Sequence, residues 1–242
     1  MFQDNPNLIK LAPEIYVYKN FLTKEELEHC SKVILSLSED RWLNNNIYDS
    51  TSEIPAPNQV FQGNEGLSFL YDKTTDFFAP EYKPLPSNGI SRMIEGQSLE
   101  VHWDSPGHPD DHDDYALENF FDQTQNPDNE RPLYDPLDTC HIVQYGYVVY
   151  VNEFEGGALY YPEQNVTYQP SAGDFVIHSS SKKYRHGVHP VTKGPRYAYT
   201  NFVTKSADMP MDLEEYLNRT DEFKEQAIKK QNNAPLWELN KK

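Results

Sequence analysis

From Gly89 onward, the hydrophobic residues follow the two-residue period of β-strands, and this pattern constrains the fold more than any other feature. The apolar runs are short, and turns rich in glycine, proline and aspartate separate them. Short strands with regular turn signals are typical of a β-sandwich or barrel. The pattern predicts strands at 90–94, 98–103, 142–152, 158–161, 174–178, 186–191 and 196–205.

Helices are predicted on either side of this β-region. Residues 14–18 alternate like a short strand, and Thr23 with Glu26 forms a capping box that begins a helix. Further helices are expected at about 65–78 and 212–230. We therefore predict a mainly β fold with flanking N-terminal and C-terminal helices, in one domain spanning 1–242. It consists of an α/β lead-in at 1–84, a core at 88–205 and a C-terminal helical part at 206–242.

The charge of the chain is strongly unbalanced, with 38 acidic against 21 basic residues and a net charge of −17. Such a surface repels phosphate backbones and anionic lipid headgroups, so neither a nucleic acid nor a membrane is the expected partner. Solubility is an alternative reason for the acidity. The 242 residues are enough for one sizeable hydrophobic core.

Cys30 and Cys140 are the only cysteines, and we expect both to be reduced thiols rather than a disulfide framework. The first residues lack the pattern of a signal peptide. No apolar run approaches the roughly 20 residues that span a bilayer. A cytoplasmic protein is expected.

Residues 105–139 interrupt the strand pattern with an acidic, proline-rich segment that begins directly after Asp104. A segment this long within a domain is usually functional or disordered. One interpretation is a lid or substrate-selecting loop. The other is a solvated insertion with a short helix near 115–121.

His102 and Asp104 are the first candidates for chemistry. Side chains two apart in a strand point to the same face, so this pair can lie side by side while Trp103 points away. A histidine from a distant strand would complete two imidazoles and one carboxylate. That ligand set leaves coordination positions open and is used by non-haem Fe(II) oxygenases.

Several histidines compete for the third position or for another role. His186 and His189 lie in one predicted strand, where three residues of spacing turn them to opposite faces. His178 either lines the site or packs at a strand end. His108 and His112 lie among aspartates, where they either bind a second divalent ion or belong to a solvated loop.

Arg196 shares one strand face with small and apolar residues: Ala198, Thr200 and Phe202. Burying a guanidinium there is costly unless an anion meets it. A carboxylate can satisfy it with two parallel hydrogen bonds. The pattern thus indicates a cosubstrate that is a carboxylic acid.

The chain from about residue 88 to 204 resembles the Fe(II)/2-oxoglutarate-dependent dioxygenases, specifically the prolyl 4-hydroxylase-like branch. The motifs are Glu95-Gly96-Gln97 before His102-x-Asp104, Tyr150-Val151-Asn152, Glu155-Gly156-Gly157-Ala158-Leu159, Pro170 with Gly173-Asp174, His186-x-Val188-x-Pro190-Val191 and Gly194-Pro195-Arg196-Tyr197. Two features depart from the family pattern. Arg92-Met93-Ile94 stands where many members have a tyrosine, and the insertion at 105–139 is long.

The resemblance implies a double-stranded β-helix, a jelly-roll or cupin-like core with the metal at its open end. It implies that His102, Asp104 and His186 are the catalytic metal ligands, and it favours His186 over His189. It assigns Arg196 to the distal carboxylate of 2-oxoglutarate, with Tyr150 as a hydroxyl partner and Thr200 as a further residue of that site.

The implied activity is oxidative decarboxylation of 2-oxoglutarate coupled to C–H hydroxylation, with Fe(II), 2-oxoglutarate and O2 as cofactor and cosubstrates. The resemblance also admits ascorbate as an additional reductant. The expected substrate is a prolyl residue in a peptide or protein, with a free amino acid or small metabolite as the alternative. Two hypotheses from other functional classes are a non-catalytic metal-binding barrel and a cupin-type isomerase. Arg196 beside a ligand triad with free coordination positions argues against both.

Overall fold

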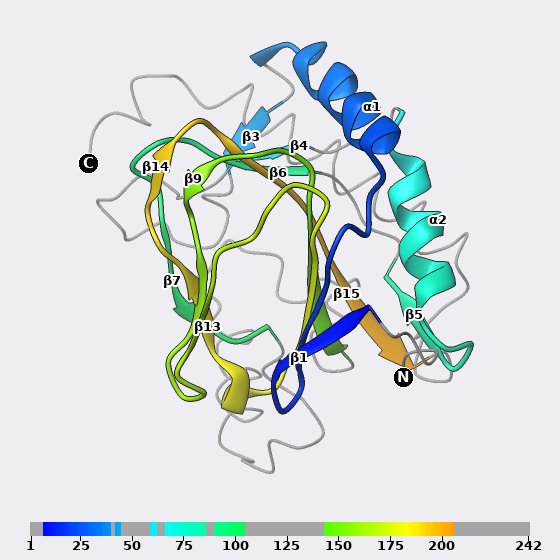
Figure 1. Cartoon of the computed structure of the whole chain (residues 1–242), viewed down its shortest axis with the longest axis vertical. Coiled ribbons are helices and arrows are strands. Elements are labelled where there is room, and N and C mark those ends of the chain that lie inside the picture. Colours follow the sequence, from blue (N-terminus) through cyan, green and yellow to red (C-terminus); the bar gives the residue numbers. More distant parts are fainter. Residues whose placement is uncertain are drawn as a thin grey trace, which may run out of the picture.

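Two β-sheets face each other and form the body of the molecule (Figure 1). The computed structural model describes residues 7–39, 42–44, 59–61, 66–85, 90–104 and 143–205. Within these residues the fold is mainly β, as the strand pattern predicts. The prediction of a C-terminal helix and those for residues 105–139 lie outside the described residues.

The larger sheet has nine strands in the order β1-β2-β12-β8-β15-β6-β4-β3, with β5 pairing to β15. All of its pairs are antiparallel. The strands are β1 (Leu8–Ala12), β2 (Ile15–Tyr18), β3 (Trp42–Asn44), β4 (Gln59–Phe61), β5 (Tyr82–Pro84), β6 (Ile90–Met93), β8 (Val143–Tyr150), β12 (Phe175–Ser179) and β15 (Arg196–Lys205).

The smaller sheet opposite has four strands in the order β11-β10-β13-β7, and β14 pairs with β9 beside it. Its strands are β7 (Leu99–His102), β10 (Leu159–Tyr161), β11 (Val166–Tyr168) and β13 (His186–Val188), with β9 (Glu155–Gly156) and β14 (Val191–Lys193) in the separate pair. A short 3-10 helix, η3 (Lys182–Tyr184), leads from β12 into β13.

The inner core lies between the two sheets. Side chains alternate along each strand, so every second residue of β8, β12 and β15 points inward. These residues pack against the inner face of the smaller sheet and against Met93 of β6. The buried cluster comprises Ile15, Val17, Met93, Val148, Tyr150, Leu159, Tyr161, Val176, Val188, Val191 and Ala198.

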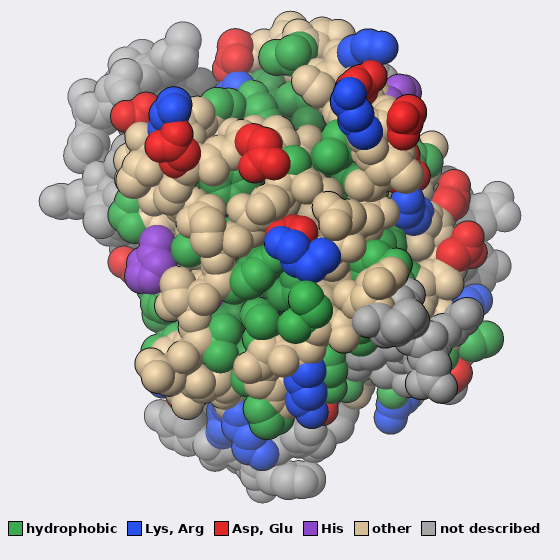
Figure 2. All heavy atoms as spheres, viewed as in Figure 1, with side chains coloured by type: hydrophobic (Ala, Val, Ile, Leu, Met, Phe, Trp, Pro, Cys, Tyr) green, Lys and Arg blue, Asp and Glu red, His purple; other side chains and the backbone are tan. Residues whose placement is uncertain are grey.

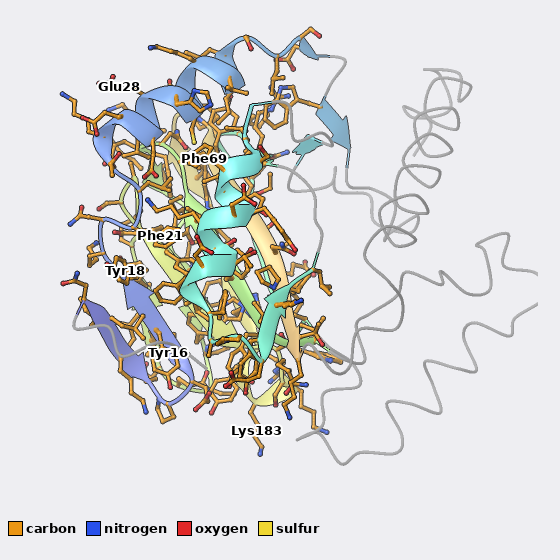
Figure 3. The ribbon with its side chains drawn as sticks, turned by 90° about the vertical axis from the view of Figure 1, so that its right-hand side faces the viewer. Tyr16, Tyr18, Phe21, Glu28, Phe69 and Lys183 are labelled. Carbon is orange, nitrogen blue, oxygen red and sulfur yellow. The ribbon has the colours of Figure 1, made fainter. Side chains whose placement is uncertain are left out.

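Two helices cover the outer face of the larger sheet and enclose a second core (Figures 1 and 3). They are α1 (Lys24–Leu35) and α2 (Ser68–Phe77). Phe21, which Figure 3 shows beneath the helices, packs on Phe77 and Phe175 with ring centroids 5.8 and 4.6 Å away. The helices thus pack on the strand residues that point away from the inner core, so the two cores lie on opposite faces of the larger sheet.

The predicted capping box is present at the start of α1. The Glu26 backbone N–H donates to Thr23 Oγ1, and the Thr23 N–H donates to Glu26 Oε2. The second predicted helix is also confirmed, at Ser68–Phe77. No helix of the described residues is long and apolar enough to cross a membrane.

One strand prediction is wrong in its extent. The expected strand at 186–191 is two strands, β13 and β14, because the chain leaves the smaller sheet at His189-Pro190. Proline has no N–H to donate to a ladder, which favours an end at this point. After the break Val191 pairs with Gly156 in the separate two-stranded sheet. The strands β1, β5, β9 and β11 carry no prediction, since two to five residues give little periodic signal. For residues 42–62 the sequence predicts a loop with a short strand, and β3 and β4 both lie there.

The surface carries charges of both signs. The face seen in Figure 2 shows acidic side chains mostly in its upper half and basic side chains both above and below a central apolar area. The acidic excess of the whole sequence is therefore not gathered into a single patch on that face.

Candidate metal centre

His102 and His186 are brought together by strand register. His102 ends β7 and His186 begins β13, and their Cα atoms are direct partners in the antiparallel pair. The ring centroids lie 4.5 Å apart. Asp104 follows His102 by two residues, and its Oδ1 is 3.6 Å from Nε2 of His102 and 3.7 Å from Nε2 of His186. One potential ligand atom from each residue therefore lies within 4.8 Å of the others.

Backbone carbonyls fix which ring nitrogen of each histidine is free. Nδ1 of His102 lies 2.9 Å from the Glu100 oxygen, and Nδ1 of His186 lies 3.2 Å from the Tyr184 oxygen. A carbonyl only accepts, so each Nδ1 carries the proton and donates it. Both Nε2 atoms then keep a lone pair directed at the common space, the arrangement found in metal-bound histidines.

The electrostatics of the site favour the protonation states that bind a cation. Burial and the neighbouring His178 together lower the pKa of His186 to about 3, although Asp104 acts in the opposite direction. Burial alone would raise the pKa of Asp104, but His186 and a hydrogen bond from His178 hold it well below its usual range. Neutral imidazoles and an ionised carboxylate are the forms that ligate a divalent metal.

The three groups differ in access to solvent. The side chains of Asp104 and His186 are 8% and 7% exposed, whereas His102 is 39% exposed. A metal held here would be enclosed by the sheets on one side and reachable past His102 on the other. Such an open side is needed for cosubstrate and substrate to reach unoccupied coordination positions.

Arg196 lies in the same interior. It is 3% exposed, and among the described residues no carboxylate contacts its guanidinium. Nη1 points at Met93 Sδ at 3.4 Å, Nη2 at Tyr150 Oη at 3.4 Å, and the buried Nε has no partner. The guanidinium also lies over the rings of Tyr150 and Phe154, at 5.0 and 5.9 Å from their centroids. A buried cation with spare donors is a site for an anion.

The register of β8 and β15 orders the interior residues along one line. Ala198 pairs with Tyr150, Thr200 with Val148, and Phe202 with Gly146. Gly146 adjoins Asp104, since a Cβ built on it would lie 2.3 Å from Oδ2. The guanidinium end and the metal end are thus at opposite ends of this row. Thr200 lies between these two ends in the strand register, and its side chain is exposed.

The other candidate histidines differ in their position relative to the triad. His189 is exposed and stacks on Tyr160, with ring centroids 4.3 Å apart, outside the triad. His178 is buried beside the triad, where its Nε2 is 3.0 Å from Asp104 Oδ2. His108 and His112 lie outside the described residues. Sequence reasoning left His178 open and missed Met93 as a neighbour of Arg196, although Met93 stands at the position that departs from the family pattern.

A face-to-face pair of antiparallel sheets with two imidazoles and a carboxylate at one end, and a buried guanidinium deeper inside, defines the class of metal-dependent oxygenases built on a double-stranded β-helix. Residues 89–204, which contain all of these groups, match the 2OG-Fe(II) oxygenase superfamily model. This part of the chain is therefore similar to that superfamily, whose name specifies Fe(II) and 2-oxoglutarate.

Two solved structures share the fold. One is a prolyl hydroxylase from Trichoplax adhaerens in complex with a hypoxia inducible factor oxygen degradation domain peptide fragment, with TM-score 0.54 and 15% identity over 81% of this chain and 85% of that one. The other is the viral collagen prolyl hydroxylase of Paramecium Bursaria Chlorella virus-1 in its 2-oxoglutarate complex, with TM-score 0.50 and 16% identity over 79% and 96%. No curated protein sequence matches the chain.

Proposed function

We propose that this dioxygenase hydroxylates a C–H bond of a prolyl residue in a peptide or protein, with Fe(II) held by His102, Asp104 and His186. The observation that carries the catalytic assignment is the buried guanidinium of Arg196, which meets no carboxylate among the described residues and lies in the same interior as the triad. A non-catalytic metal-binding module or an isomerase has no use for a second, anion-seeking group at this depth.

Arg196 and Tyr150 are proposed to bind the distal carboxylate of 2-oxoglutarate. Two guanidinium nitrogens and one phenol hydroxyl supply donors that now meet only a thioether and each other. Burial raises the pKa of Tyr150 although Arg196 lowers it, so the phenol keeps its proton for donation. Thr200, on the same strand face as Arg196, is proposed as a further residue of the 2-oxoglutarate site.

When bound, Fe(II) with 2-oxoglutarate and O2 supplies the oxidative decarboxylation that yields succinate and CO2 and the hydroxylation of the substrate. The chain contributes geometry. Nδ1 donation to backbone carbonyls orients the two imidazoles, and the inner core excludes water behind them. Arg196 and Tyr150, which we call the carboxylate clamp, would hold the distal carboxylate and so direct the 2-oxo acid end of the cosubstrate to the metal.

The prolyl substrate is supported by the fold shared with two prolyl hydroxylases, one of them bound to a peptide. Phe202, 37% exposed at the level of the metal, offers an apolar surface that suits a pyrrolidine ring. A free amino acid or small metabolite is the alternative substrate. We also propose a single domain over residues 1–242 and a cytoplasmic location.

The first experiment tests the site without turnover. Anaerobic addition of Fe(II) and 2-oxoglutarate is expected to give the visible charge-transfer band of the chelate in the wild-type protein. His186→Ala should abolish the band. A wild type without the band, or an unchanged band in His186→Ala, would refute the assignment.

The second experiment tests the substrate class. Proline-containing peptides are incubated with the loaded enzyme, and succinate release is measured together with a one-oxygen mass gain on the peptide. Proline-to-alanine versions of the same peptides are the controls. Mass gain that persists in the alanine versions, or that appears only on free amino acids, would overturn the prolyl assignment while leaving the oxygenase assignment intact.

A further inference from the structure

His178 is a buried imidazole that the triad does not use. It lies near the end of β12 in the inner face of the larger sheet and is 1% exposed. Both ring nitrogens have a partner: Nδ1 lies 2.9 Å from Tyr161 Oη, and Nε2 lies 3.0 Å from Asp104 Oδ2. A chain of three side chains therefore runs from β10 through β12 to the carboxylate that follows β7.

The two oxygens of Asp104 face different groups. Oδ1 points at Nε2 of both His102 and His186, at 3.6 and 3.7 Å, and so borders the space that the three ligands share. Oδ2 is taken by His178. This division leaves one carboxylate oxygen for a metal and holds the other away from it.

The direction of the hydrogen bonds follows from the chemistry of the end groups. A carboxylate can only accept, so Nε2 of His178 must carry a proton and donate it to Oδ2. Nδ1 can then accept from the Tyr161 hydroxyl, and burial raises the pKa of that phenol well above its usual range, so its proton is retained. Tyr161 thereby favours the tautomer of His178 that is protonated on Nε2 and donates a hydrogen bond to the Asp104 carboxylate.

The backbone opposite makes room for this contact. A Cβ built on Gly146 would lie 2.3 Å from Asp104 Oδ2 and 2.9 Å from His178 Nε2. Any side chain at 146 would push the carboxylate and the imidazole apart. Gly146, which has no Cβ, thus stands where β8 borders the hydrogen bond.

We propose that His178 is a positioning residue that, with Tyr161 behind it, fixes Asp104 as a one-oxygen ligand of the metal. This inference rests on the proposed function, because it takes Asp104 as a ligand. Metal-bound carboxylates are commonly held by such outer partners, whose loss typically lowers metal affinity or activity about 10–100-fold.

The test measures metal binding rather than turnover. Co(II) is titrated into the folded protein, and both the affinity and the visible d–d spectrum are recorded. His178→Phe removes the donor and should weaken Co(II) about tenfold or more, with a changed spectrum as Asp104 becomes free to bind through two oxygens. His178→Gln, which can place an amide N–H near the position of Nε2, should restore much of both. His189→Gln, an exposed histidine outside the triad, is the matched control and should behave as wild type.

The outcomes separate the two proposals. If Asp104→Ala and His186→Ala bind Co(II) as the wild type does, the metal assignment itself fails. If those variants lose Co(II) but His178→Phe retains wild-type affinity and spectrum, only the positioning role is overturned. Equal losses in His178→Phe and His178→Gln would show that ring packing matters and not the hydrogen bond, which also overturns it. Should His178→Phe not fold, Tyr161→Phe and His178→Gln decide: the proposal predicts a weaker effect of the same sign in each.

Discussion

At the scale of single residues, the interior holds polar groups that cost stability unless a ligand meets them. Arg196 is the clearest example, because its Nε has no partner and its terminal nitrogens reach only a thioether and a phenol. A buried cation without an anion is unfavourable for the free protein. The proposed function explains its presence, since the same spare donors would bind the carboxylate of 2-oxoglutarate.

Replacing Arg196 with Met should therefore separate stability from binding. The apolar side chain has a similar length, so the free energy of unfolding of the metal-free protein should rise or stay unchanged. Affinity for 2-oxoglutarate should fall by about 2–5 kcal/mol, or roughly 30-fold or more. Denaturant unfolding and equilibrium binding of 2-oxoglutarate to the Co(II) protein measure the two effects. Loss of Co(II) binding in this variant would argue against the clamp role.

Tyr150, beside the guanidinium of Arg196, allows a smaller substitution that removes only a hydroxyl. Tyr150→Phe keeps the ring under the guanidinium but removes the hydroxyl that points at Nη2. We expect 2-oxoglutarate to bind roughly tenfold more weakly, the value of one hydrogen bond to a charged group, with Co(II) affinity unchanged. An unchanged affinity for 2-oxoglutarate would remove Tyr150 from the site.

Gly146 sets the space around Asp104 and can be tested alone. Gly146→Ala places a Cβ against Asp104 Oδ2 and should lower Co(II) affinity at least tenfold, because the carboxylate must move. Gly96→Ala is the control: it has no atom within 4 Å of the new Cβ and only its φ of +86° to strain it. That variant should lose about 1 kcal/mol of stability and keep its metal affinity. Equal metal affinities in the two variants would contradict the close contact at Gly146.

At the scale of elements, the helix signals in the sequence proved reliable. The capping box at Thr23 satisfies backbone N–H groups locally and therefore does not depend on the rest of the fold. The hydrogen bond of Glu26 to Lys73 then ties the first turn of α1 to α2. That contact joins residues 47 positions apart, and no local pattern predicts it.

Removing the cap should have a modest effect that remains confined to stability. Thr23→Ala is expected to reduce the free energy of unfolding by about 1 kcal/mol, and Thr23→Ser should restore most of it. Denaturant unfolding followed by circular dichroism measures this change. Metal affinity should be unaffected in both variants, because α1 covers the outer face of the sheet and the triad lies between the sheets.

The strands show that hydrophobic periodicity predicts long strands well and very short strands poorly. Long strands such as β8 and β15 are evident from the sequence, while the two- and three-residue strands are set by their partners. His189-Pro190 illustrates the limit, since the alternation continues across it but the sheet does not. The break depends on β9 being available to pair with Val191.

At the scale of the whole molecule, two cores share one sheet. The outer core beneath the helices includes Cys30, Phe175, Tyr147 and Tyr199, and the inner core carries the site. Both cores use side chains of the larger sheet, which point alternately to its two faces. Partial unfolding of this sheet would therefore expose both cores to solvent. The reactivity of the Cys30 thiol can be used to detect such exposure, because Cys30 belongs to the outer core and is fully buried.

Burial raises the pKa of Cys30 to about 12, so its thiol should remain protonated in the folded protein well above pH 9. The unfolded chain loses that proton near pH 9, and it therefore binds fewer protons than the native state there. Stability should consequently fall as pH rises from about 9 toward 12. In a Cys140→Ser background, iodoacetamide should label native Cys30 slowly at pH 8.5 and quickly after denaturation. Rapid labelling of the native protein would show that this core is open.

The sequence by itself determined the fold class, the capped helix, the His-x-Asp pair and the buried arginine, because each depends on local periodicity or on the chemistry of one side chain. Only the tertiary structure decided which histidines meet. Strand register sets His186 opposite His102, sends His189 outward and places His178 against the second oxygen of Asp104. Such contacts join residues 74 or more positions apart, and their geometry follows from the pairing of whole strands, which no stretch of sequence encodes alone.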